Sequence, residues 1–134
     1  MTEIHMLRVA DVMGREYSTI DGIATVAEAL AVMQKKGAHF LIVAKRNKDD
    51  ELGIVMVSDI AKHVLARNRP AERINVYEIM SKPVLSVSPR MDIRYCARLF
   101  HRFGISTAPV IEDDEIRGVV TYDQLVLRGL ARIS

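Results

Sequence analysis

The chain has 134 residues, of which 49% are hydrophobic and 27% are charged, and its formal net charge is +2. This composition is typical of a folded globular protein and excludes an intrinsically disordered chain. The small net charge gives no reason to expect an anionic membrane or nucleic acid as the partner, and no apolar run is long enough to cross a bilayer.

The cellular compartment is indicated by the N-terminus and by cysteine usage. The first residues lack the apolar stretch and small-residue cleavage site of a signal peptide. The single cysteine, Cys96, cannot form an internal disulfide, which suits a reducing compartment. We therefore expect a cytoplasmic protein.

The first predicted elements are a strand over Tyr17–Ile20 and a helix that follows it. The segment Thr25–Glu28 matches a capping box, in which the threonine hydroxyl and the glutamate carboxylate bind exposed backbone amides. Apolar residues at helical spacing then predict one buried face. Gly37 is expected to end the helix in a left-handed conformation.

A hairpin and a second helix are predicted next. Phe40–Ala44 and Leu52–Val57 are short apolar runs that predict two buried strands, joined by a solvated turn. A helix is expected to start at Ser58 or Asp59 and to run to about Ala66.

The second half of the chain predicts the same order of elements. Val84–Val87 is a predicted strand, and Asp92 is a predicted helix cap. Thr107–Ile111 and Ile116–Thr121 form a predicted hairpin, and Tyr122–Ala131 is the closing helix. The apolar helix positions are those of the first half displaced by 67 residues, namely Ile93, Cys96, Ala97 and Phe100.

The two halves are an internal duplication. The spacing from Met13 to Gly37 is 24 residues, and so is the spacing from Met80 to Gly104. We therefore predict an α/β (α+β) protein made of two pseudo-symmetric β-α-β-β-α repeats packed as one module, with a ligand site in the cleft between them. The predicted boundaries are residues 1–66 for the first repeat, 67–75 for a connector and 76–134 for the second repeat.

Several motifs carry a resemblance to a known family. Val9-Ala-Asp-Val-Met13 and Val76-Tyr-Glu-Ile-Met80 open the repeats, and Gly53–Ile60 and Gly118–Leu125 form strand-to-helix junctions. In their order and spacing, these motifs resemble a tandem CBS-domain pair, often called a Bateman module. The resemblance implies a regulatory ligand, AMP, ADP, ATP or S-adenosylmethionine, and no required cofactor.

The resemblance also implies which residues line two ligand sites. In the family's junction motif, an aspartate accepts hydrogen bonds from ribose hydroxyls and a threonine or serine supports the ribose or phosphate. The first site would contain Ser18, Ala38, His39, Ile54, Met56 and Asp59. The second site would contain Leu85, Ile105, Ser106, Val119, Thr121 and Gln124.

Both junctions depart from the family pattern. The first keeps Asp59 but has Met56 in place of the hydroxyl residue; the second keeps Thr121 but has Gln124 in place of the aspartate. We therefore predict that the Asp59 site is the better nucleotide site. Other interpretations of these residues stay open. Thr121 and Gln124 also match a capping box, and Asp59 would be favourable at a helix N-terminus through the helix dipole alone. His39 is either a phosphate contact or an exposed loop residue.

Two functional hypotheses follow. The first is a stand-alone regulatory module that binds an adenosyl ligand and signals to a partner protein, whose identity the sequence does not give. The second is a ligand-free module for protein interaction, with degenerate sites. Catalytic and metal-binding patterns are missing from the sequence. The aromatic content of 5% gives no reason to expect nucleic acid as a partner, and the apolar helices of each repeat predict a homodimer.

Overall fold

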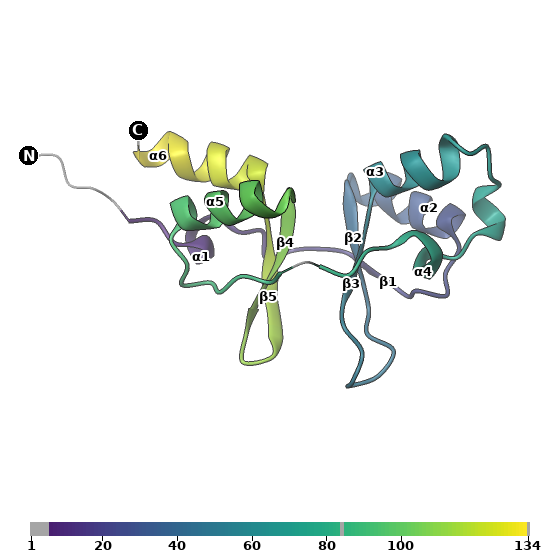
Figure 1. Ribbon diagram of the computed structural model, residues 1–134, viewed down its shortest axis with the longest axis horizontal. Coiled ribbons are helices and arrows are strands. Elements are labelled where there is room, and N and C mark those ends of the chain that lie inside the picture. The colour runs from purple at the N-terminus through teal and green to yellow at the C-terminus, as the bar shows by residue number, and fades with distance from the viewer. Residues whose placement is uncertain (1–5, 84, 134) are drawn as a thin grey trace, which may run out of the picture. The chain divides into compact units, whose positions relative to one another are not determined.

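The computed structural model describes residues 6–83 and 85–133, and Figure 1 shows the helices and strands that they form. The chain forms two compact units. One unit is Tyr17–Pro83, and the other combines the described residues of Met1–Glu16 with those of Val84–Ser134. Among the described residues, no helix is long and apolar enough to cross a membrane.

The unit Tyr17–Pro83 is built on a three-stranded sheet of order β1-β2-β3. β1 runs parallel to β2, and β2 and β3 form an antiparallel hairpin in which Phe40 pairs with Met56. The elements in chain order are β1 (Thr19–Ile20), α2 (Val26–Lys36), β2 (Phe40–Val43), β3 (Gly53–Met56), α3 (Val57–Ile60), a π-helix η1 (Ala61–Leu65), a 3₁₀ turn η2 (Ala71–Arg73) and α4 (Val76–Ile79).

The other unit is built on the antiparallel hairpin of β4 (Thr107–Glu112) and β5 (Glu115–Thr121). Its remaining elements are α1 (Val9–Val12), α5 (Ile93–Phe103), a π-helix η3 (Gln124–Leu130) and α6 (Ala131–Ile133). From the long helix onward, the order of helix, hairpin and closing helix therefore repeats as predicted, with small shifts of the boundaries. For example, α3 begins at Val57, one residue earlier than expected.

The predicted strand Val84–Val87 is wrong as a strand, and its first residue lies outside the described residues. Of the described residues 85–87, only Val87 bridges β4, donating to the Pro109 carbonyl at 3.0 Å and accepting from the Ile111 amide at 3.0 Å. The next bond of a parallel ladder would run from residue 109 to the Leu85 carbonyl, and proline has no N–H to donate. At the equivalent place in the other unit, Ile42 does donate to Ser18, at 3.0 Å.

The predicted caps of the two long helices are confirmed. Thr25 Oγ1 accepts from the Glu28 amide at 3.1 Å, and the Glu28 carboxylate accepts from the Thr25 amide at 3.3 Å. Asp92 accepts from the Arg94 amide at 2.7 Å. Gly37 ends α2 at φ 63°, a left-handed conformation that a residue with a Cβ rarely adopts.

The opening segment of each repeat, residues 9–14 and residues 74–81, packs on the body of the other repeat. Ser81 and Ile54 exchange two backbone hydrogen bonds of 2.9 and 2.8 Å, while Gly14 and Val119 exchange two of 2.9 Å. The core of Tyr17–Pro83 therefore includes Ile74, Val76 and Ile79, and the core of the other unit includes Val9, Val12 and Met13.

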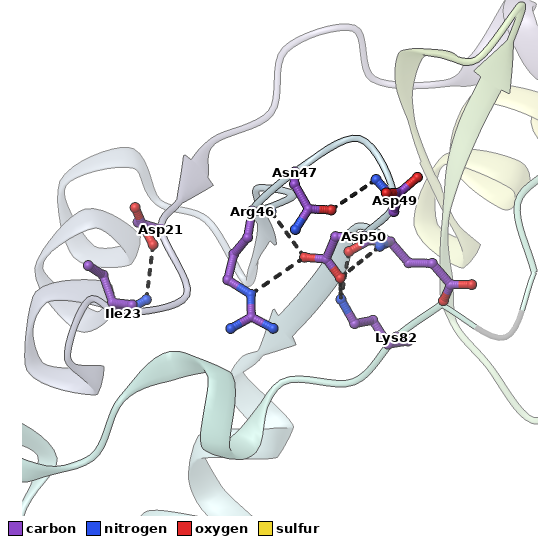
Figure 2. A network of polar contacts seen from close by, with 8 residues as sticks. Asp21, Ile23, Arg46, Asn47, Asp49, Asp50 and Lys82 are labelled. Carbon is purple, nitrogen blue, oxygen red and sulfur yellow. Dashed lines mark hydrogen bonds and ion pairs between the residues drawn. The ribbon is translucent and has the colours of Figure 1, made fainter.

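The loop between β2 and β3 is tied to the segment that follows α4 through Asp50, as Figure 2 shows. The Asp50 carboxylate accepts from the Arg46 amide at 3.0 Å and from Lys82 Nζ at 3.1 Å. Lys82 Nζ also donates to the Glu51 carbonyl at 2.6 Å. These bonds hold the segment that follows α4, which contains Lys82, against the hairpin within this unit.

Candidate ligand-binding sites

All six residues predicted for the first site lie in the unit Tyr17–Pro83. Most of them lie at the edge of the sheet where β2 begins and β3 ends, because Phe40 at the start of β2 pairs with Met56 at the end of β3. The Val57 amide donates to the His39 carbonyl at 3.0 Å, which brings the turn before β2 beside the start of α3.

The turn before β2 is shaped by the end of α2. After the left-handed Gly37, the Ala38 amide donates to the Met33 carbonyl at 2.9 Å and the chain reverses into the strand. Ala38 is half-buried and His39 is exposed. The imidazole therefore stands at the surface beside the β3–α3 junction, where it is accessible to a ligand group.

Asp59 is the polar centre of the first site. It lies in the first turn of α3, and its Oδ2 accepts from the Met56 amide at 2.8 Å. Among the described residues, Oδ1 has no hydrogen-bond partner, and the side chain is half-buried. A carboxylate offers about four acceptor positions on its two oxygens. Asp59 therefore caps its helix and keeps acceptor capacity for hydroxyl groups.

Ser18 brings a hydroxyl group to the first site, whereas Ile54 brings only apolar side-chain atoms. The Ser18 carbonyl accepts from Ile42, and Ile54 is only 5% exposed with its backbone bonded to Ser81. Met56 is half-buried and offers a thioether, which donates no hydrogen bond.

The six residues of the second site all lie in the other unit, with the same local geometry. Thr107 pairs with Thr121, and the Tyr122 amide donates to the Ser106 carbonyl at 3.2 Å. Ile105 is half-buried and Val119 is only 1% exposed. The edge formed by the start of β4 and the end of β5 therefore corresponds to the edge that carries Asp59.

The polar side chains of the second junction bind each other's backbone. The Thr121 amide donates to Gln124 Oε1 at 3.0 Å, and the Gln124 amide donates to Thr121 Oγ1 at 3.3 Å. The predicted capping box is thus present. The side-chain nitrogen of Gln124, Nε2, also packs against Gly14, and a Cβ added to Gly14 would lie 2.7 Å from this nitrogen. Unlike Asp59, Gln124 brings no charge to the site.

Leu85 differs from Ser18 because of Pro109. The Ser18 carbonyl accepts from the Ile42 amide, whereas Pro109, at the position equivalent to Ile42, has no N–H to donate to Leu85. Among residues 6–83 and 85–133, the Leu85 carbonyl therefore accepts no hydrogen bond of the kind that its counterpart accepts. The proline in the printed sequence is the signal that predicts this difference.

Metal ligands and the cysteine thiol are the two other kinds of reactive group to consider. No group of three or more histidine, cysteine, aspartate or glutamate residues in residues 6–83 and 85–133 is arranged to hold a metal ion. Burial raises the pKa of the Cys96 thiol from 9.0 to about 11, so the thiol stays protonated and unreactive at neutral pH. The sequence reasoning missed the residues that cover both junctions, Ser81 and Gly14, because hydrophobic spacing does not show which repeat an opening segment joins.

Comparison with known proteins identifies the family. The CBS domain family matches residues 9–66 and again residues 76–129. The chain belongs to the CBS-domain family. The two junction edges described above are therefore corresponding parts of two CBS repeats, and the predicted fold class is confirmed.

Individual relatives match this chain over most of its length. The uncharacterized protein MK0525 of Methanopyrus kandleri is 24% identical over 119 residues, which are 88% of this chain and 60% of that protein. A hexameric CBS-CP12 protein from bloom-forming cyanobacteria has a TM-score of 0.88 at 36% identity, over 92% of this chain and 68% of that one.

A third relative was solved with ligands. The CBS domain pair of MJ0100, in complex with 5-methylthioadenosine and S-adenosyl-L-methionine, has a TM-score of 0.80 at 23% identity. It covers 96% of this chain and 99% of its own. At this identity the likeness shows a common fold. This chain spans 60% of the length of the Methanopyrus kandleri relative, so that protein extends beyond the matched region.

Proposed function

We propose that this CBS pair is a regulatory module that binds an adenosyl compound at the junction of β3 and α3. The observation that carries the proposal is the position of Asp59. Its carboxylate lies at the start of a helix with one oxygen bound to Met56 and further acceptor capacity remaining. Such a carboxylate suits the vicinal hydroxyls of a ribose, since both can donate to it.

The class of ligand is supported by the relative solved with S-adenosyl-L-methionine and 5-methylthioadenosine. Within the adenosyl class, AMP, ADP, ATP and S-adenosylmethionine all carry the ribose that Asp59 would bind. We propose that the compound acts as a regulatory ligand rather than as a substrate, and that the pair regulates a partner protein without performing catalysis.

Regulation requires that the ligand bind one conformation of the pair more tightly than another, because equal affinity for both would shift no equilibrium. Ile54 offers a route for such a difference. It belongs to the candidate site, and its backbone also bonds to Ser81, in the segment that follows α4. A ligand that moves β3 would therefore act on the segment that leaves this unit.

Isothermal titration calorimetry of the full chain with AMP, ATP and S-adenosylmethionine tests the ligand proposal. We expect saturable heat with at least one compound. No heat with any of them at ligand concentrations well above those of cells would contradict the proposal.

Asp59→Ala is expected to weaken binding more than Gln124→Ala does. The two variants form a matched pair, since each removes the side chain that binds the first backbone amide of its junction, at 2.8 Å for Asp59 and 3.0 Å for Gln124. A loss of affinity caused only by the missing helix cap would therefore be similar in the two variants. Equal losses of affinity in calorimetry would show that Asp59 has no special role.

The second candidate function is a ligand-free interaction module. The observation that favours it is the closed pair of Thr121 and Gln124, whose side chains are already bonded to the backbone. This function predicts that no adenosyl compound changes the melting temperature, because a ligand of the native state must raise it by mass action. A rise in melting temperature with any of the compounds would reject the ligand-free function.

We also propose that the protein forms a homodimer in the cytoplasm. The π-helix η1 exposes 78% of Leu65, which is a large apolar side chain to leave in water. The single buried thiol of Cys96 suits a reducing compartment. Size-exclusion chromatography with light scattering tests the dimer, and a monomeric mass at high protein concentration would contradict it.

A further inference from the structure

The chain crosses between its two units twice, after Glu16 and after Pro83. The segments that precede the crossings are residues 14–16 and residues 81–83, and they lie at corresponding places in the two repeats, 67 residues apart. A comparison of the two segments therefore shows what one crossing has beyond the needs of the repeat.

The backbone attachment of the two segments is the same. Ser81 exchanges hydrogen bonds of 2.8 and 2.9 Å with Ile54 of β3. Gly14 exchanges two hydrogen bonds of 2.9 Å with Val119 of β5. This pairing is therefore common to both repeats.

The next residue of each segment is basic, and the two side chains differ in what holds them. Lys82 Nζ donates to Asp50 Oδ1 at 3.1 Å and to the Glu51 carbonyl at 2.6 Å. Its counterpart Arg15 is exposed, and the ion pairs formed among residues 6–83 and 85–133 do not include it. The segment 81–83 therefore has an attachment that the segment 14–16 lacks.

The acceptors of Lys82 are provided by the loop that joins β2 to β3, residues 44–52. The other hairpin has no such loop, because its strands continue and close in a tight turn at residues 113–114, where φ is 54° and 62°. A hairpin of this fold can thus be closed without the longer loop. The loop is needed only for what it holds.

This loop is ordered around Asp50, as Figure 2 shows. The Asp50 carboxylate accepts from the amides of Arg46 at 3.0 Å and Glu51 at 2.9 Å, and the Asp50 amide donates to the Asn47 carbonyl at 3.1 Å. The side chain of Asp50 is only 19% exposed and that of Lys82 is 39% exposed. The loop itself therefore places a fixed, partly covered carboxylate where the ammonium group of the crossing segment can bind it.

We propose that the β2–β3 loop is a strap that fixes the segment 81–83 to its unit through Asp50 and Lys82. The segment and β3 then move as one body, because the backbone pairing and the strap hold the segment to the same strand and its loop. The segment 14–16 has no strap, so it is the crossing at which the chain retains conformational freedom. The strap does not require a ligand at Asp59, and only a role for it in regulation rests on the proposed function.

Nitrogen-15 relaxation of the full chain, without ligand, compares the two crossings directly. We expect the backbone amide of Lys82 to have an order parameter of about 0.85, the value of rigid backbone, and the amide of Arg15 to have a lower one. Lys82→Met keeps an apolar side chain and removes the ammonium group, so it should lower the order parameter at position 82 to about that of Arg15. Equal order parameters at the two positions in the unaltered chain would overturn the proposal.

Hydrogen exchange measures how often the strapped segment opens. The amides of Ser81 and Ile54 report this opening, since they bond the segment to β3. Asp50→Asn and Lys82→Met should each speed the exchange of both amides about three- to tenfold, as expected when a partly exposed ion pair is lost with its hydrogen bonds. The double variant should be no faster than the faster single variant, because both groups belong to one link. Effects that multiply in the double variant would show two independent roles and would reject the strap.

Two controls separate the strap from general stability. Arg15→Met removes the corresponding charge from the other crossing and should leave the exchange of the Gly14 and Val119 amides unchanged. The amide of Met33, in α2, reports unfolding of the whole unit and should exchange at the same rate in the unaltered chain and in the strap variants. Equal acceleration at Met33 and at Ser81 would mean that the variants only destabilise the unit, which decides against the strap.

The experiment keeps its outcome if one variant fails to fold. Should Lys82→Met unfold by circular dichroism, Lys82→Gln removes the same charge and gives the same test. Calorimetry separates this inference from the proposed function. The absence of heat with every adenosyl compound would reject the proposed function, whereas relaxation and exchange in the ligand-free chain decide the strap.

Discussion

At the scale of single residues, Asp50 is a carboxylate whose pKa is lowered by the bonds that it accepts. Hydrogen bonds from the Arg46 amide, from Lys82 and from the Glu51 amide lower the pKa of Asp50 from 3.8 to about 2. Because the pKa is lower in the folded protein, Asp50 contributes stability that is present above pH 3.8 and is lost as the pH falls toward about 2.

Asp50→Asn is therefore expected to lower the free energy of unfolding at neutral pH, and the deficit should shrink as the pH approaches 2. Urea unfolding at several pH values measures it. Asp49→Asn, in the same loop, removes a charge whose carboxylate does not bind Lys82, and it serves as the control. A deficit of the same size at all pH values would contradict the assignment.

Gly118 is the residue where a single methyl group should matter most. A Cβ at this position would collide with the backbone carbonyl of Gly14, in the segment that crosses β5. We expect Gly118→Ala to destabilise the protein by about 1–3 kcal/mol, the usual cost of overpacking. Gly22→Ala is the matched control, since its Cβ would meet only ordinary contacts at 3.5 Å. Equal stability of the two variants in urea would show that the crossing segment yields easily.

At the scale of elements, the helix caps are simple local signals. Thr25→Ala should cost about 1 kcal/mol in urea unfolding, because the Glu28 amide loses its acceptor. Thr25→Ser keeps the hydroxyl and should retain most of the stability. A serine variant as unstable as the alanine variant would mean that the methyl group, and not the cap, is important.

The elements also show how far the sequence predicts this fold. Caps, helix lengths and both hairpins follow from spacings that act within a few residues, and these predictions were confirmed. The prediction of a strand over residues 84–87 was wrong because the length of that strand depends on Pro109, which lies in the neighbouring strand β4. The same applies to the sites: the sequence places Asp59 and Gln124 at corresponding junctions, but only the structure shows that Gln124 is engaged with Thr121.

At the scale of the whole molecule, the exchange of opening segments distinguishes sequence repeats from folding units. Residues 1–66 contain the first CBS repeat, but they lack Ile74, Val76 and Ile79, which are 2%, 0% and 5% exposed in the core of that unit. Fully burying a side chain of this size is worth about 1.5–3 kcal/mol, so the loss is roughly 5–9 kcal/mol, comparable to the stability of a whole domain.

We therefore expect a fragment of residues 17–83 to unfold cooperatively on heating, and a fragment of residues 1–66 to remain unfolded although it is nearly the same length. Circular dichroism on both fragments measures the difference. A separate peptide of residues 71–83 should restore helical signal when it is mixed with fragment 1–66. The peptide supplies Val76, Ile79 and the Ser81 backbone that pairs with Ile54. A folded 1–66 fragment without the peptide would show that each repeat is complete in itself. The exchange would then be a packing detail and not a requirement of the CBS pair.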